Sequence, residues 1–161
     1  MPDASNPPAP LRIDAETPAD AQAVEALVLA AFGPGRFAKT AERLRERSRV
    51  AAAFVARDAG RVIGSVRLWA LTVGGEPALF LGPIAVAADN RRSGLGAELV
   101  QACVDHARTA GGGGILLVGD RAYFERFGFR PAPDVRLPGP VDPARVLWLG
   151  EGLPAGDVRP A

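Results

Sequence analysis

Residues 91–100, RRSGLGAELV, combine two arginines and two glycines with a following run of helical spacing. The first N–H groups of a helix have no partner within it and carry partial positive charge, so this end attracts anions. Gly94 and Gly96 lack a Cβ and would let a phosphate approach the backbone. Arg91 and Arg92 could add charge-assisted hydrogen bonds. The pattern differs from both common nucleotide-binding loops, so alone it predicts either a phosphate site or an ordinary glycine-rich turn.

The neighbouring segments predict a mixed α/β domain in which this stretch joins a strand to a helix. Apolar runs bounded by turn residues predict strands at 11–13, 51–57, 62–71, 78–86, 115–118 and 146–149. Helical spacing and capping residues predict helices at 17–32, 37–48, 94–110 and 122–127. Residues 84–86 and 115–118 are joined by a crossover helix, so we expect these segments to lie in parallel.

Length and composition predict a single domain over residues 11–161, preceded by a disordered, proline-rich tail at 1–10. The formal charge of +1 provides no field that would attract nucleic acid or an anionic membrane to the whole protein. The sequence shows no signal peptide and no apolar run of the ~18 residues that a membrane span needs, so we expect a cytoplasmic protein. With one cysteine, the chain cannot form an intrachain disulfide, and without a Cys/His cluster the sequence predicts no metal site.

Two longer segments of residues 81–132 carry a specific resemblance. LGPIAVAADNRRSGLGAELVQACVDHARTAG, followed by ILLVGDRAYFERFGFRPA, resembles the cofactor-binding half of the GNAT superfamily of acetyl-CoA-dependent N-acetyltransferases. The resemblance implies a mixed α/β fold, with a mostly antiparallel central sheet, one parallel pair of strands that splay apart, and flanking helices. It also implies that acetyl-CoA lies in the gap between the splayed strands.

The resemblance assigns cofactor contacts to two backbone segments. The loop before the helix would contact the pyrophosphate, and the strand before the loop would contact the pantetheine arm and the thioester. The loop residues are Arg91, Arg92, Ser93, Gly94, Leu95 and Gly96, and the strand residues are Ile84, Ala85 and Val86.

Amide formation needs a donor for the developing oxyanion and benefits from an acid for the departing thiolate. The resemblance assigns the oxyanion donor to a backbone N–H of the strand, here that of Val86. It places a tyrosine acid four residues before the glycine of the GF pair, but that position is Phe124, with Tyr123 one residue earlier. One residue rotates a side chain by about 100° around a helix. Tyr123 could therefore act through a shifted helix start, water could protonate the thiolate, or the protein could bind CoA without turnover.

The general base is not evident, because residues 79–86 contain no carboxylate. Asp120 is better explained as the cap of the short helix, which leaves an ordered water as the alternative base. His106 and Cys103 lie on the same apolar stripe of the predicted helix, so we expect both side chains to serve packing. Trp69 and Trp148 could line an acceptor pocket, although single aromatic residues in predicted strands more often belong to the core.

The leading hypothesis is an N-acetyltransferase that moves an acetyl group directly from acetyl-CoA to the primary amine of a small molecule or peptide. The alternative is a CoA-binding sensor or regulatory module with weak or no catalysis, which the missing tyrosine and base would explain. A third hypothesis is an arginine-mediated nucleic-acid partner of residues 36–49, although a solvated face is the usual explanation for such a segment. The sequence leaves the acceptor and the oligomeric state open, with a homodimer as one alternative.

Overall fold

A computed structural model describes residues 11–33, 40–90, 93–111 and 113–161. The tail expected at 1–10 and the arginines Arg91 and Arg92 lie outside the described residues. The helices are α1 (Ala21–Phe32), α2 (Thr40–Glu46), α3 (Leu95–Ala110) and α4 (Arg121–Phe124), with 3-10 turns at Pro18–Asp20, Glu125–Phe127 and Pro143–Arg145. The strands are β1 (Arg12–Ala15), β2 (Arg49–Asp58), β3 (Arg61–Val73), β4 (Glu76–Val86), β5 (Ile115–Val118), β6 (Arg130–Pro131), β7 (Val135–Arg136), β8 (Val146–Leu149) and β9 (Gly156–Pro160).

The strands form one sheet whose main path runs β1-β2-β3-β4-β5-β8-β6. Along this path the pairs are antiparallel, with β4–β5 as the parallel pair. β9 pairs with the far end of β3, and the short β7 lies parallel to β9. The structure therefore has the mixed, mostly antiparallel architecture that the sequence predicts.

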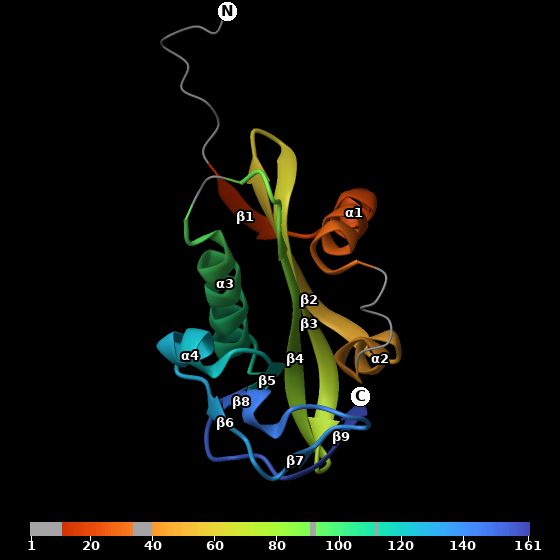
Figure 1. Ribbon diagram of the computed structural model, residues 1–161, viewed down its shortest axis with the longest axis vertical. Coiled ribbons are helices and arrows are strands. Elements are labelled where there is room, and N and C mark those ends of the chain that lie inside the picture. The colour runs from red at the N-terminus through yellow and green to blue at the C-terminus, as the bar shows by residue number, and fades with distance from the viewer. Residues whose placement is uncertain (1–10, 34–39, 91–92, 112) are drawn as a thin grey trace, which may run out of the picture.

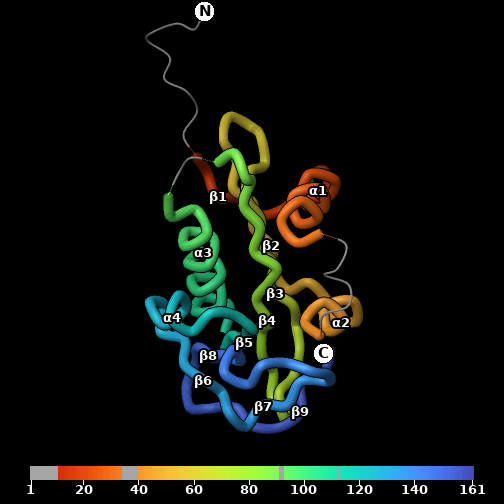
Figure 2. Tube along the Cα trace, in the orientation of Figure 1, coloured from red at the N-terminus to blue at the C-terminus, as the bar shows by residue number. Residues whose placement is uncertain are grey.

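The sheet separates two helical layers (Figure 1). α3 covers one face, where Leu95, Leu99 and Cys103 join the largest apolar cluster. α1 and α2 cover the other face, α1 through Val24 and Val28 and α2 through Leu44. Figure 2 shows that the chain passes between these layers along β4, from the lower end of the sheet to the start of α3.

β4 and β5 touch over only a short length. Their register pairs Leu79 with Ile115 and Phe80 with Leu116, while β4 continues to Val86 along β3 alone. The prediction that these strands are parallel is confirmed. Residues 84–86 lie beyond the point where the two strands diverge, as the resemblance implies for a splayed pair. Divergence leaves one side of β4 without a neighbouring strand over its last residues.

A β-bulge in β4 lies at the start of this unpaired portion. The β3–β4 register passes from Leu68↔Leu81 to Val66↔Ile84, so Gly82 and Pro83 both face Arg67. A proline cannot donate to a sheet ladder, and a bulge is one of the few strand positions that tolerate it. The Gly82–Pro83 peptide is cis. The indole N–H of Trp69 donates to the Gly82 carbonyl at 2.6 Å and fixes the backbone of the bulge from β3.

The helix predicted from Thr17 begins as a 3-10 turn and ends, as α1, at Gly33, whose φ is 69°. Asp20, only 6% exposed, closes the turn by accepting the N–H of Thr17 at 2.8 Å. Both of its oxygens also accept guanidinium donors of Arg57, each at 2.7 Å. These bonds, led by those from Arg57, hold the pKa of the Asp20 carboxyl well below its ordinary value. The ion pair thus ties the start of α1 to β2.

Asp20→Asn is expected to lower the urea midpoint at neutral pH, because it removes the charge that Arg57 faces. The pKa of Asp20 is depressed in the folded state, so its stabilisation is present above the ordinary carboxyl value of 3.8 and is lost as the pH falls below it. The wild type and the variant should therefore converge at low pH in urea titrations followed by circular dichroism. Asp89→Asn, which removes an exposed pair with Arg61 at 3.1 Å, is the control and should change little. A constant difference between wild type and Asp20→Asn at all pH values would contradict the ion-pair explanation.

Candidate active site

The divergence of β4 and β5 opens a cavity of about 640 Å³. β4 forms one wall and the end of β5 forms the opposite wall, while α2, α4 and the segment before β8 close the remaining sides. The lining residues are Phe32, Thr40, Ala41, Glu42, Arg45, Leu81, Gly82, Pro83, Ile84, Leu117, Val118, Gly119, Asp120, Phe124, Pro140, Val141, Asp142 and Arg145. We call this cavity the strand gap.

The free edge of β4 presents backbone donors on the side of the strand gap. Ala87 donates its N–H to Ile63 of β3 at 2.8 Å. Hydrogen bonding alternates along an antiparallel pair, so the N–H groups of Ile84 and Val86 point away from β3. Ala85 lies between them, and its side chain is buried under α1 with Val24 and Val28. Of the three predicted strand residues, Ile84 and Val86 therefore offer free-edge donors, whereas Ala85 does not.

The start of α3 has the backbone form expected of an anion site. Gly94, at a φ of 82°, is the N-cap and has no side chain with which to cap the helix. Leu95 is 2% exposed and packs into the core, so only its backbone can face a ligand. At Gly96, the one contact that an added Cβ would make with the described residues is the Tyr123 hydroxyl, at 3.6 Å. Ser93 is exposed beside them.

The short helix α4 separates the two aromatic residues that the sequence left undecided. Phe124 lines the strand gap. Tyr123 turns the other way, toward Gly96 and the first turn of α3, and the Arg126 guanidinium lies 4.3 Å from its ring centre. Asp120 caps the helix by accepting the Ala122 N–H at 2.9 Å, which confirms its predicted role.

The arginine-rich helix α2 is only partly the solvated face that the sequence predicts. Arg43, Glu46 and Arg47 are exposed as expected. Arg45 is not: its side chain is 14% exposed, pairs with Glu42 at 3.3 Å, and holds its guanidinium 5.4 Å from the centre of the Phe80 ring. The prediction was wrong at Arg45 because α2 packs flat against the sheet, which turns this side of the helix toward the strand gap.

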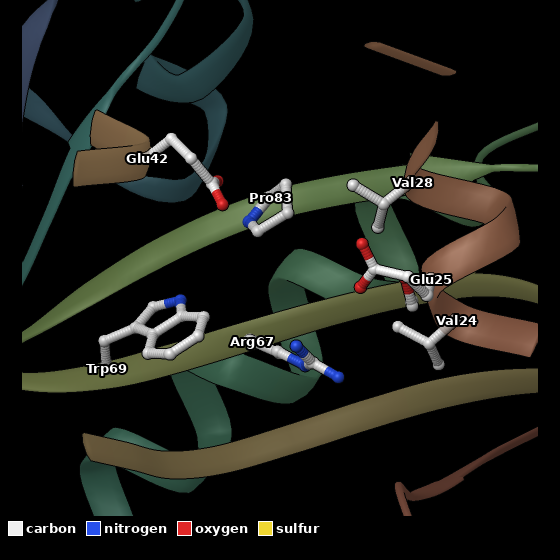
Figure 3. A pocket seen from close by; sticks show the side chains of 8 residues that line it. Val24, Glu25, Val28, Glu42, Arg67, Trp69 and Pro83 are labelled. Carbon is white, nitrogen blue, oxygen red and sulfur yellow. The ribbon is translucent and has the colours of Figure 1, made fainter. Parts of the chain in front are cut away.

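A second cavity, of about 230 Å³, lies between α1, α2 and β3. Its lining residues are Val24, Glu25, Val28, Glu42, Ser65, Arg67, Trp69 and Pro83. In Figure 3 the carboxylates of Glu25 and Glu42 enter it from two different helices, and Trp69 and Arg67 form its floor. We call this cavity the helix pocket.

The two tryptophans, for which the sequence allowed either a core or an acceptor-pocket position, differ in their surroundings. Trp148 is 6% exposed and belongs to the core as predicted. Trp69 instead lines the pocket while its N–H holds the bulge. Arg67 beside it forms an ion pair with Glu16, in which two guanidinium nitrogens donate to the carboxylate oxygens at 3.0 and 3.2 Å.

Two residues line both cavities, namely Pro83 of the bulge and Glu42 of α2. The bulge is therefore the wall between the strand gap and the helix pocket. Sequence reasoning missed Glu42, Glu25 and Arg45 as site residues, because charged residues on a short helix look the same whether they face solvent or a cavity. Only the docking of α1 and α2 on the sheet distinguishes them.

The remaining reactive side chains serve packing. Cys103 is fully buried, and burial raises the pKa of its thiol to about 12, so it is no nucleophile. The ring of His106 packs edge-on against Phe54 at a centroid distance of 6.0 Å. Both observations confirm the prediction of an apolar stripe on α3. Across the described parts of the chain, His, Cys, Asp and Glu side chains form no cluster of three that could bind a metal, and no helix there is long and apolar enough to cross a membrane.

Comparison with known families agrees with this geometry. The family model described as acetyltransferase (GNAT) family matches residues 21–129. The chain therefore belongs to the GNAT family, the class of acetyl-CoA-dependent N-acetyltransferases. The match extends from the start of α1, through the bulge and the α3 loop, to the residue after Gly128.

Three bacterial relatives illustrate the similarity. The chain is 35% identical over 123 residues to the uncharacterized N-acetyltransferase YhbS of Escherichia coli K12, covering 74% of each chain. It is 28% identical to YjhQ of the same organism, covering 84% of this chain and 81% of YjhQ. The crystal structure of E. coli YhbS in complex with CoA aligns with a TM-score of 0.81 at 29% identity, covering 97% of this chain and 92% of YhbS. A GNAT acetyltransferase of Brucella melitensis in complex with acetyl-CoA aligns with a TM-score of 0.72 at 26% identity, covering 92% and 94%.

Proposed function

We propose that this protein transfers the acetyl group of acetyl-CoA directly to a primary amine, with the cofactor in the strand gap and the amine in the helix pocket. One observation carries the proposal: the two cavities meet at the β4 bulge, with Pro83 as their common wall. Because Pro83 and Glu42 line both cavities, an amine and a thioester bound in them could meet beside the bulge and react without a covalent acyl-enzyme. No nucleophilic side chain is then required, which agrees with the buried, protonated Cys103.

The strand gap suits an acyl-CoA in both shape and donors. When bound, acetyl-CoA supplies the thioester whose carbonyl carbon accepts the amine and whose sulfur leaves as thiolate. The free edge of β4 would bind the pantetheine amides, and the α3 loop from 91 to 96 would bind the pyrophosphate through backbone N–H groups. Arg91, Arg92 and Ser93 are assigned to that loop by the family motif. The gap near α2 also carries Arg45.

The oxyanion donor should be one of the two free N–H groups of β4. Val86 is the donor that the sequence predicts. Ile84 meets the same condition and is closer along the chain to Pro83, where the two cavities join. We therefore propose that Ile84 contacts the carbonyl oxygen and that Val86 contacts the pantetheine arm. A preformed backbone donor of this kind contributes about 10²–10³ in rate in other acyl-transfer enzymes.

The proposal is tested by incubating the purified protein with acetyl-CoA and a panel of primary amines. The panel is n-butylamine, phenethylamine, spermidine, glucosamine and a lysine-containing peptide, and the readout is the CoA thiol released. Thiol release that depends on the amine, with a matching acetylated product by mass spectrometry, would support transfer. CoA binding without any amine-dependent release would contradict it and favour the regulatory module.

Tyr123→Phe is expected to lower the turnover number by no more than about tenfold. The Tyr123 hydroxyl lies beside Gly96 of α3, whereas Phe124 lines the strand gap. A thiol with a pKa near 8.5 leaves readily as thiolate, so water can supply the proton. Turnover measured across pH decides the question. A loss of 10² or more would establish Tyr123 as the acid, and no change at any pH would exclude it from the chemistry.

A further inference from the structure

Among the residues that the structure describes, Glu42 is the polar residue that lines both cavities. It comes from α2, its side chain is 12% exposed, and its carboxylate extends toward Pro83 (Figure 3). Pro83 lies where the acceptor in the helix pocket and the thioester in the strand gap would meet. A carboxylate at this point reaches the acceptor nitrogen on one side without blocking the cofactor on the other.

We propose that Glu42 binds the acceptor as an ammonium ion and takes the proton that the nitrogen must lose before it attacks, which makes the physiological acceptor a cationic primary amine. This inference rests on the proposed acetyl transfer. It supplies the base that the strand residues 79–86 lack, and it comes from α2 rather than from the sheet.

The proton balance of the reaction requires an acceptor for one proton of the ammonium ion, and the Glu42 carboxylate is proposed as that acceptor. An alkylammonium ion has a pKa of about 10.4, so near neutral pH it is almost fully protonated and has no lone pair. Its first proton passes to the Glu42 carboxylate and then to water. The freed lone pair forms the N–C bond as the C–S bond breaks, and the second proton leaves the nitrogen for the departing sulfur. One net proton is released for each amide formed.

The charges around Glu42 favour a cation as its ligand. Arg45 contacts Glu42 from the same helix at 3.3 Å and orients the carboxylate along the bulge. Across the helix pocket lie Glu25 of α1 and Arg67 of β3, and the charge of Arg67 is matched by Glu16. The Val24 and Val28 side chains provide an apolar surface for the stem of the amine.

The groups on the other side of Glu42 line the strand gap. They are Asp120 at the end of β5, and Asp142 and Arg145 before β8. Asp120 is already committed to the Ala122 N–H, and Asp142 caps its own turn through the Ala144 N–H at 3.0 Å. Of the carboxylates that line the gap, Glu42 is the one that also lines the helix pocket.

The test compares two nucleophiles in three variants. Glu42→Gln should lower turnover with the most active amine of the panel by about 10²-fold, a usual contribution of a general base. The same variant should lose less than about threefold with hydroxylamine, which is largely uncharged at neutral pH and needs no such base, after the enzyme-free rate is subtracted. With the alkylamine, the rate of Glu42→Gln should follow the free-amine fraction and rise about tenfold per pH unit below the amine pKa of about 10.4, so that its deficit shrinks at high pH. The affinity for CoA should stay the same.

Two further variants keep the test decisive. Glu46→Gln makes the same change on the exposed side of α2 and should match the wild type throughout. Glu42→Asp keeps the charge and should keep the pH dependence of the wild type, while losing more rate with the alkylamine than with hydroxylamine. Equal losses with both nucleophiles in the two Glu42 variants would make Glu42 a structural residue and overturn the inference. A wild type inactive with every amine would contradict the acetyl transfer itself.

Discussion

Gly96→Ala is expected to weaken the binding of CoA by about tenfold to a hundredfold while leaving the protein as stable as the wild type or slightly more stable. Packing against the described residues does not require glycine here, because an added Cβ would meet the Tyr123 hydroxyl at an ordinary 3.6 Å. Alanine favours a helix over glycine by up to about 1 kcal/mol. A loss of affinity without a loss of stability would therefore report a ligand that approaches the bare backbone of α3.

Isothermal titration with CoA measures the affinity, and urea unfolding measures the stability of the same preparations. Gln101→Ala, on the exposed side of α3 one turn further on, is the control and should bind CoA like the wild type. Unchanged CoA affinity in Gly96→Ala would place the pyrophosphate elsewhere and remove the main support for the phosphate interpretation of residues 91–96.

Gly82→Ala is expected to reduce acetyl transfer by about 10²-fold, the loss expected when the reacting groups are displaced by about 1 Å. Gly82 has a φ of 134°, a region that residues with a Cβ rarely adopt, and its Cβ would lie 2.5 Å from a guanidinium nitrogen of Arg45. Relaxation of the bulge would shift Pro83 and Ile84, and it would move the carbonyl that Trp69 holds at 2.6 Å. The variant should also unfold more easily, by about 1–3 kcal/mol.

The control for this strain is Gly75→Ala in the β3–β4 turn. Gly75 also has a positive φ, 87°, but a Cβ there would meet nothing within 4 Å. The substitution should cost about 1 kcal/mol of unfolding free energy and leave transfer unchanged, as measured by urea unfolding and by CoA thiol release. If the two variants lost activity in proportion to their stability alone, the bulge would have no special part in catalysis.

The sequence predicted the regular elements well because their signals are local. The helix expected at 94–110 is Leu95–Ala110, and the strand expected at 115–118 is found at those residues. The short strands β6, β7 and β9 were less accessible. β6 and β7 span two residues each, and proline stands in β6 and β9, so no alternating pattern could develop.

For the site too, residues with a local sequence signal could be predicted, whereas residues placed by tertiary packing could not. Gly94 and Gly96 could be predicted to expose backbone because glycine spacing at a helix start has a direct physical meaning. The site positions of Glu42, Arg45 and Trp69 depend on how α2 and β3 meet the bulge, and no spacing rule encodes that contact. Tyr123 and Phe124 differ by one helical step, so their directions required the actual packing of α4 against Gly96 and Gly119.

The two-residue contact between β4 and β5 has a consequence for the molecule as a whole. It leaves a seam in the middle of a continuous sheet, with β1 to β4 on one side and β5, β8 and β6 on the other. A cofactor whose arm carries amide groups can bridge that seam much as a further strand would. A bound cofactor would then join two halves of the sheet that otherwise share few backbone hydrogen bonds. Binding of the cofactor would therefore also stabilise the contact between these halves.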